Sequence, residues 1–368
     1  MPVKIGIDIR DLKIAQTGAK TYLVSLIDAW QKIPNASICL LDNKNKVYRG
    51  TNTILKIIEH FRFVWWKQIQ LSHIAKQERC THIFCSDFFV PYFKRGLKTI
   101  AVLHDAFFWE SPEHYHSLWL QLFHKMGVPA AKKANLIIVP SAYVKKRILY
   151  FENFDPNKIV VVYEAAKAFL PILNEPPIIN IAINAPYFLH VGVLEKRKNI
   201  PQLIEAFAKV VEKYPTYHLY LAGNMPVKNK FNDAPNIQYT IQKLGLYNNV
   251  HLLGYVKDGE VAQLYSQAFG YILPSKNEGF GLPLLEAFSF GLPVISSNGG
   301  ALPEIAAGAA QMFDLKDVNS TNNLANAICT MIENESVRNL FAQKGIQRNK
   351  DFSWIQTAAQ INEHIKNI

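Results

Sequence analysis

Two glutamates stand close together in the second half of the chain, within PSKNEGFGLPLLEAFSFGLPVI at residues 274–295. Glu278 and Glu286 flank a Gly-Phe-Gly turn. Carboxylates accept hydrogen bonds from sugar and ribose hydroxyls, and exposed backbone N–H groups donate to phosphates. The turn glycines, Gly279 and Gly281, carry no side chain and let the backbone approach a ligand. The stretch therefore suits a nucleotide-sugar, which presents both hydroxyls and phosphates.

A structural role would explain one of these acids. The sequence predicts a strand at YILP (residues 271–274), then a loop, and then a helix from Pro283 that ends at Gly291. Glu286 would then lie in the first helical turn, where free N–H groups favour a carboxylate. Glu278 precedes the helix, so helix capping gives no reason for its presence.

A basic pair suits the other end of such a ligand. Arg197 and Lys198 follow a predicted strand, YFLHVGV at 187–193, and precede a predicted helix. This places them at the carboxyl edge of a sheet, where α/β proteins bind ligands. Fixed cations there would stabilise the charge that develops on a departing nucleoside diphosphate. The alternative is a solvated Lys/Arg cluster within EKRKN.

The first half offers weaker candidates. His104 ends the strand-like run KTIAVLH and Asp105 follows it; a lone histidine at a strand end is more often structural than catalytic. The stretch AQTGAKTY (15–22) is a glycine turn that runs into a helix. Its N–H groups around Gly18, together with Lys20, could bind phosphate or an acceptor. A plain strand–helix turn is the alternative.

The elements that must position these residues alternate between strand and helix, which predicts two doubly wound α/β domains with a cleft between them. Strands are predicted at 4–9, 81–86, 98–105, 134–141 and 157–165, and again at 187–193, 218–223, 250–256, 268–275 and 293–297. The domains are predicted at 1–168 and 187–350, with a proline-rich linker at 169–186 and a last helix at 351–368.

Composition fits a packed globular protein of 368 residues, 49% apolar and 19% charged. No apolar run approaches the ~20 residues of a membrane span, and the N-terminus lacks a signal-peptide profile. Four cysteines show neither zinc-type spacing nor a disulfide framework. We therefore expect a protein of a reducing cytoplasm.

Charge is unevenly distributed. Residues 1–170 hold 24 Lys and Arg against 13 Asp and Glu, a net charge of +11, whereas residues 171–368 hold 16 of each. The first domain is therefore expected to meet something anionic, such as membrane phospholipid, a lipid pyrophosphate or nucleic acid. A merely soluble basic face is the alternative. The stretch at 61–77 combines basic and aromatic residues, predicted mainly as core and otherwise as contact with acceptor or membrane surface.

Several motifs together resemble the retaining glycosyltransferases of family 4, which have the GT-B fold. EGFGLPLLEA resembles their paired-glutamate motif, and GVLEKRKNIPQLIEAFAKV their phosphate-binding segment. VLHDAFFWESPEHY is similar to their His-Asp loop, and GIDIRDLKIAQTGAKTYL to their N-terminal strand and glycine loop. The resemblance implies two Rossmann-like domains that face each other across a cleft, with the C-terminal helix packing back on the first domain.

The resemblance also implies roles. The second glutamate, Glu286, would hold the donor ribose, and Glu278 would face the transferred sugar. His104 would contact that sugar, while Asp105 orients His104 or meets the acceptor. The remaining donor-binding residues are implied to be Arg197 and Lys198 for the diphosphate, Gly279, Phe280, Gly281 and Leu282 for the sugar, Tyr255 and Val256 for the base, and Gly192 at the strand end. Many members carry an arginine directly after that glycine, where this chain has Val193.

The function implied is retaining transfer of a sugar, with the leaving phosphate helping to deprotonate the acceptor. The resemblance also implies that no cofactor and no metal is needed. Similarity to bacterial O-antigen-type mannosyltransferases suggests GDP-mannose as donor and a glycan or polyprenyl-linked acceptor. The basic first domain would account for peripheral contact with an anionic membrane. Two other classes stay open: a nucleotide-sugar epimerase or hydrolase of similar fold, and a basic nucleic-acid-binding protein. No nucleic-acid motif favours the last, so we expect no nucleic-acid partner.

Overall fold

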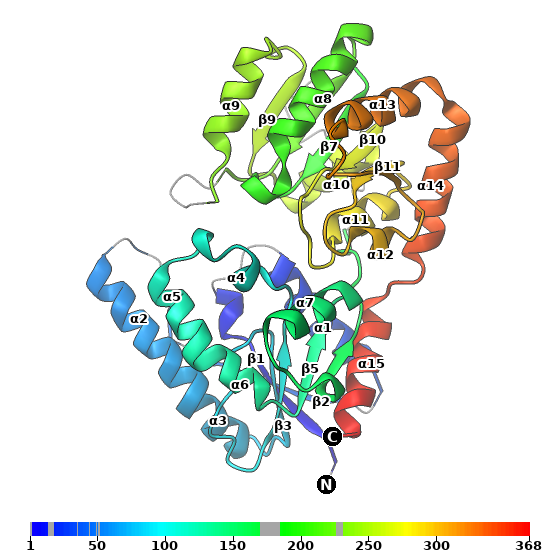
Figure 1. Cartoon of the computed structure of the whole chain (residues 1–368). Helices are drawn as coiled ribbons and strands as arrows, with labels where there is room; N and C mark the ends of the chain where they lie inside the picture. Colours follow the sequence, from blue (N-terminus) through cyan, green and yellow to red (C-terminus); the bar gives the residue numbers. More distant parts are fainter. Residues whose placement is uncertain are drawn as a thin grey trace. The chain divides into compact units, whose positions relative to one another are not determined.

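The computed structural model describes residues 2–13, 18–34, 36–43, 45–48, 50, 52–169, 185–225 and 231–368. The chain divides into two compact units, Met1–Glu164 with Ser353–Ile368, and Ala165–Phe352. Each unit contains a six-stranded parallel sheet with helices packed against it (Figure 1). Residues 170–184 of the predicted linker lie outside the described residues.

The sheet of the first unit has the strand order β2-β1-β3-β4-β5-β6. Its strands are β1 (Lys4–Asp8), β2 (Ser37–Leu41), β3 (His82–Cys85), β4 (Lys98–Val102), β5 (Leu136–Val139) and β6 (Ile159–Val161). Its main helices are α1 (Gly18–Lys32), α2 (Thr53–Trp65), α3 (Leu71–Gln77), α4 (Phe107–Glu110), α5 (Ser117–Leu122), α6 (Val128–Lys132) and α7 (Ala142–Phe151). Five of the six strands were predicted; β2, at the sheet edge, was not.

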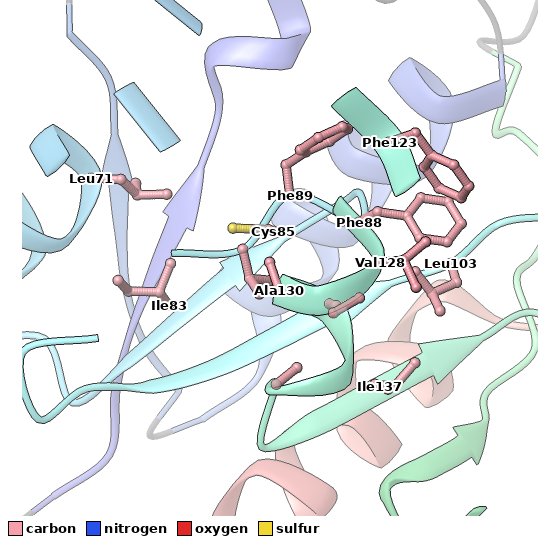
Figure 2. Close-up of a cluster of buried hydrophobic side chains, with 14 of the residues drawn as sticks. Leu71, Ile83, Cys85, Phe88, Phe89, Leu103, Phe123, Val128, Ala130 and Ile137 are labelled. Atoms are coloured by element: carbon pink, nitrogen blue, oxygen red, sulfur yellow. The ribbon is translucent and has the colours of Figure 1, made fainter. Parts of the chain in front are cut away.

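Helices cover both faces of this sheet because its strands are apolar on both sides. Successive residues of β3 show the alternation: Ile83 and Cys85 belong to one buried cluster and Phe84 to another. Figure 2 shows the first cluster, in which the strand residues meet aromatic side chains such as Phe88 and Phe123. Burial of this kind favours folding by about 25 cal/mol per Å² of apolar surface.

The last helix, α15 (Trp354–Lys366), completes the second cluster of the first unit. Ala358, Ile361 and Ile365 are fully buried there, and the Thr357 hydroxyl donates to the Tyr163 carbonyl at 2.7 Å. The prediction that the C-terminal helix packs on the first domain is therefore confirmed.

The sheet of the second unit has the order β12-β11-β10-β7-β8-β9. Its strands are β7 (Tyr187–Val191), β8 (His218–Ala222), β9 (Val250–Gly254), β10 (Gly270–Leu273), β11 (Val294–Ser297) and β12 (Gln311–Phe313). Its helices are α8 (Ile200–Lys213), α9 (Ala234–Lys243), α10 (Asp258–Gln267), α11 (Leu282–Ser289), α12 (Leu302–Ala306), α13 (Ser320–Glu333) and α14 (Glu335–Asn349). The edge strand β12 was not predicted.

The aromatic stretch at 61–77 divides between core and surface. Phe63 and Trp66 are buried, as expected of a core stripe, whereas Phe61 is 72% exposed and Trp65 57% exposed. The core interpretation is thus right for two of these four aromatic residues and wrong for the other two, which α2 exposes to solvent. Within the described ranges, no helix combines the length and the apolar character that crossing a membrane requires.

Candidate active site

Two loops around Glu278, one before α11 and one before α12, each contain a glycine at which a side chain would cause strain. Gly281 has φ +103°, and a Cβ there would lie 2.7 Å from the Leu302 side chain. Gly300 has φ +66°, and a Cβ there would come within 2.3 Å of the Glu278 carbonyl oxygen. The N–H of Ala301 donates to that same carbonyl at 2.9 Å. The loop at Gly300 and Ala301 therefore packs closely against the backbone of Glu278 and hydrogen-bonds to it.

The side chain of Glu278, one of the two predicted acids, binds both members of the predicted basic pair. Its Oε1 accepts from Lys198 Nζ at 2.6 Å and its Oε2 from Arg197 Nη1 at 2.8 Å. Glu278 is 7% exposed and Lys198 4%. Burial alone would raise the pKa of Glu278, but Lys198 and Arg197 outweigh it and lower that pKa to about 2. Glu278 is therefore a carboxylate at neutral pH.

Sheet topology explains why residues 80 positions apart meet. Arg197 and Lys198 follow β7, and Glu278 follows β10, which is paired with β7 in parallel. The carboxyl ends of neighbouring parallel strands lie at the same edge, so the two loops converge. The N–H of Lys276 donates to the Arg197 carbonyl at 2.7 Å and ties the loops together. Arg197 also pairs with Glu195 at 3.2 Å.

Gly192 and His190 lie beside Lys198, at the carboxyl end of β7. A Cβ at Gly192 would lie 3.5 Å from Lys198 Cε and 3.8 Å from His190 Nε2. The Nδ1–H of His190 donates to the Ile272 carbonyl at 2.9 Å. Within the described part of the chain, the buried Nε2 has no hydrogen-bond partner. Burial, with Lys198 nearby, lowers the pKa of His190 to about 4, so the ring is neutral.

Sequence reasoning missed His190. The available signal was a polar residue in the otherwise apolar run YFLHVGV.

Glu286 lies in α11, the helix that follows the glycine loop. It is the fifth residue of that helix, so the expectation that it lies in the first turn is wrong. The carboxyl group is buried and accepts a hydrogen bond from the Tyr265 hydroxyl at 3.1 Å. Burial raises the pKa of Glu286 to about 7, although the Tyr265 hydrogen bond works in the opposite direction. No short sequence pattern marked Tyr265 as its partner.

Other predicted donor residues lie around these loops. Tyr255 follows β9 and is 71% exposed, and Val256 beside it is partly buried. Gly279 is buried, and Leu282 begins α11. The Phe280 ring is buried and packs 5.9 Å from the Phe352 ring. Because that ring faces the core, only the backbone of this position can serve the predicted sugar pocket.

In the first unit, His104 is held by a residue that the sequence did not indicate. Its Nδ1 lies 3.2 Å from a Glu164 carboxylate oxygen, and the Tyr22 ring packs edge-on at 4.7 Å. Burial would lower the pKa of His104, but Glu164 raises it above its ordinary value. Asp105 accepts from the N–H of Phe107 at 2.9 Å, which shapes the turn into α4.

Gly18 and Lys20 belong to the exposed first turn of α1, and residues 15–17 lie outside the described residues. Across the described ranges, no group of three or more His, Cys, Asp or Glu side chains is arranged to hold a metal ion. Metal independence stays a prediction, as do the roles assigned to the individual site residues.

Two family models match the chain, one within each of the two units. Residues 172–348 match the family described as Glycosyl transferases group 1, and residues 18–166 match Glycosyltransferase Family 4. Together these matches account for most of the chain. The protein is therefore a glycosyltransferase that belongs to family 4, with the GT-B fold.

Individual relatives agree with this assignment. The sequence is 27% identical over 285 residues to O-antigen chain mannosyltransferase B of Escherichia coli, covering 74% of this chain and 71% of the relative. Sucrose-phosphate synthase from Thermosynechococcus elongatus superposes with a TM-score of 0.77 at 19% identity, covering 99% of this chain and 98% of that one. Anabaena HepE, solved with UDP-glucose, gives 0.73 at 20% identity, covering 99% and 100%. These two structures show the fold alone.

Proposed function

We propose that this glycosyltransferase moves a mannosyl group from GDP-mannose to a hydroxyl of a glycan or lipid-linked acceptor, with retention of configuration and without a metal. The observation that carries the proposal is the buried Glu278 carboxylate between Lys198 and Arg197, at the carboxyl edge of the second sheet. The mannosyltransferase of Escherichia coli to which the chain is similar supports mannose as the sugar.

The cations and the carboxylate would exchange partners when the donor binds. Diphosphate oxygens are strong acceptors for an ammonium and a guanidinium group, so they would compete with Glu278 for Lys198 and Arg197. Glu278 would then be available to accept hydrogen bonds from hydroxyls of the transferred sugar. Its low pKa keeps it ionised for this task.

Transfer would proceed on one face of the sugar. The bond from the anomeric carbon to the diphosphate oxygen breaks as the acceptor oxygen bonds to that carbon, and the acceptor proton passes to the leaving phosphate. Arg197 and Lys198 would stabilise the negative charge on the leaving group. We propose that Glu286, with Tyr265, binds the ribose diol, so the two glutamates do not act as the acid and nucleophile of a glycosidase.

The acceptor would bind the first unit. That unit contains the described residues up to Glu164 of the stretch 1–170, whose net charge is +11, so an anionic group on the acceptor is favoured electrostatically. We also propose that the same charge brings the protein to the surface of an anionic membrane.

Donor binding tests this function. Replacing both Arg197 and Lys198 by Ala should weaken binding of the preferred donor by at least about tenfold, since charge-assisted hydrogen bonds contribute about 1.5–3 kcal/mol each. Lys196→Ala, in the same turn but exposed, is the matched control and should bind normally. A thermal-shift panel of GDP-, UDP-, ADP- and dTDP-sugars measures the effect, because a ligand of the native state raises the melting temperature.

If the donor raised the melting temperature of the double variant as much as that of Lys196→Ala, the assignment would be contradicted. Arg197→Ala alone leaves the Lys198–Glu278 pair in place and covers the case in which the double variant does not fold. Donor consumption without acceptor at the full rate would argue against transfer and for an epimerase or hydrolase.

A further inference from the structure

Two cysteines of the first unit lie close together near one edge of its sheet. Cys39 is the third residue of β2, and Cys80 lies between α3 and β3. In the sheet, β1 separates β2 from β3, and Gly6 of β1 is paired with Cys39. The two cysteines thus belong to segments on either side of one strand. Both are free thiols.

The missing side chain of Gly6 lets the Cys80 sulfur reach across β1. A Cβ at Gly6 would lie 3.1 Å from Cys80 Sγ and 2.6 Å from Leu41 Cδ1. Leu41 and Cys39 are two residues apart on β2, so their side chains point to the same face of the sheet. The Cys80 sulfur therefore lies on the face to which the Cys39 side chain points.

The two thiols are hydrogen-bonded to each other. Burial raises the pKa of both, that of Cys80 to about 11, and the hydrogen bond between them adds to the rise at Cys80 and partly offsets the rise at Cys39. Cys80 is therefore the donor and the Cys39 sulfur the acceptor. From this contact the sulfurs have only to move toward each other to form an S–S bond of about 2.05 Å. Because β2 is an edge strand with one strand neighbour, it can follow this movement more easily than a central strand.

Cys39 is the member of the pair that a reagent can reach. It is partly exposed, whereas Cys80 is 6% exposed. Burial, and then the Glu78 carboxylate at 3.8 Å, raises the pKa of Cys39 above 9.0. At neutral pH the thiol is therefore mostly protonated, and its exchange with a disulfide is slow. A thiol of high pKa is also a poor leaving group, so a disulfide between the two would resist reduction once formed.

Neither of the other two cysteines competes for this contact. Cys85 is fully buried in β3, and Cys329 belongs to the second unit. In reducing compartments, the disulfides that do form are mostly catalytic or redox-sensing. A pair of thiols in contact, one of them accessible, suits the second of these roles.

We propose that Cys39 and Cys80 form a disulfide when the protein meets an oxidised low-molecular-weight thiol such as glutathione disulfide. Cys39, as the thiolate, attacks one sulfur of glutathione disulfide, and the first glutathione leaves and takes up the proton that Cys39 lost. Cys80 then attacks the Cys39 sulfur, the bond to the second glutathione breaks, and that glutathione takes up the Cys80 proton. Two protein thiols are oxidised, and one glutathione disulfide is reduced to two glutathione molecules. The new bond would tie β2 to the segment between α3 and β3.

The test is incubation of the folded protein with glutathione disulfide, followed by alkylation of the remaining thiols and mass spectrometry of its peptides. Wild type should yield a peptide pair joined by a Cys39–Cys80 bond. Cys80→Ser should instead accumulate a glutathionyl group on Cys39, because no second thiol is present to release it. Cys329→Ser removes the other partly exposed thiol and is the matched control, which should form the bond at the wild-type rate.

The rate has a predicted pH dependence. Between pH 7 and pH 9 the bond should form roughly tenfold faster per pH unit, because the thiolate fraction of Cys39 rises in that proportion below its pKa. Peptide mapping of wild type requires no substitution, so the test survives a Cys80→Ser variant that does not fold.

Three outcomes would overturn the proposal: no Cys39–Cys80 peptide pair, a glutathionyl group that persists on Cys39 in wild type as it does in Cys80→Ser, or a bond that forms only between two copies of the chain. Failure of the proposed function would show separately, because Arg197, Lys198 and Glu278 belong to the second unit.

Discussion

Replacing Glu286 by Gln should change how the stability of the protein depends on pH. In the folded chain, burial raises the pKa of this carboxyl from 4.5 to about 7. The folded state thus binds the proton more tightly than the unfolded state does. The stabilisation from the protonated acid is complete below pH 4.5 and is lost as pH rises through 7. Glutamine keeps the neutral shape of the acid and cannot ionise.

The size of the effect follows from the two pKa values. A difference of one pKa unit corresponds to about 1.4 kcal/mol. Between about pH 5.5 and pH 7.5, linkage predicts that Glu286 lowers the free energy of unfolding by about 2 kcal/mol, a loss that Glu286→Gln should not show. The quantity to compare is therefore the pH slope and not the absolute stability of either protein.

Urea unfolding at several pH values measures that slope. All six tryptophans, at positions 30, 65, 66, 109, 119 and 354, belong to the first unit. Tryptophan fluorescence therefore follows that unit, whereas circular dichroism follows both, and the Glu286 effect should appear in the transition that only circular dichroism detects. Glu205→Gln, on the exposed side of α8, is the matched control and should keep the wild-type slope.

Parallel slopes for wild type and Glu286→Gln would refute the reasoning, because the carboxyl would then ionise as easily in the folded chain as in the unfolded one.

Two other variants test the second unit. Glu278→Gln should destabilise the protein at neutral pH by up to about 3 kcal/mol, because the low pKa of Glu278 contributes stability above pH 4.5 that disappears as pH falls through 2. Urea unfolding at pH 7 measures this loss. Unchanged stability would show that Lys198 does not depend on this partner. Gly300→Ala should lower the melting temperature more than Gly308→Ala does and should weaken donor binding. Both positions have positive φ, but only the Cβ at position 300 would meet backbone, at the Glu278 carbonyl. Equal losses of melting temperature for the two variants would show that the Glu278 loop yields to the added methyl group.

The fold could be predicted from sequence where strands are buried on both faces. Central strands such as β3 and β10 are fully buried and appear as continuous apolar runs. The two strands that were missed, β2 and β12, lie at sheet edges. Only one of the five residues of β2 is fully buried, and β12 has three residues. Edge position alone does not hide a strand, because β6 and β9 also lie at sheet edges and were predicted from their apolar runs.

The sequence singled out candidate residues of the site but did not reveal the contacts between them. Glu278, Arg197 and Lys198 were recognised from their local sequence, but spacing along the chain does not show that they form one buried cluster. That contact depends on β7 and β10 being neighbours, which only the strand order reveals. Glu164 and Tyr265, which hold His104 and Glu286, were missed because a buried partner of this kind leaves no local pattern.

The placement of α15 has a consequence for how the protein is made. Because this helix completes the apolar cluster that also contains α1, the first unit cannot reach its final packing until residue 365 has left the ribosome. The second unit, by contrast, is continuous in sequence and can fold while synthesis finishes. During that interval the α1 face of the first unit stays uncovered, so premature termination near residue 352 should yield an aggregation-prone chain even though every proposed donor-binding residue is present.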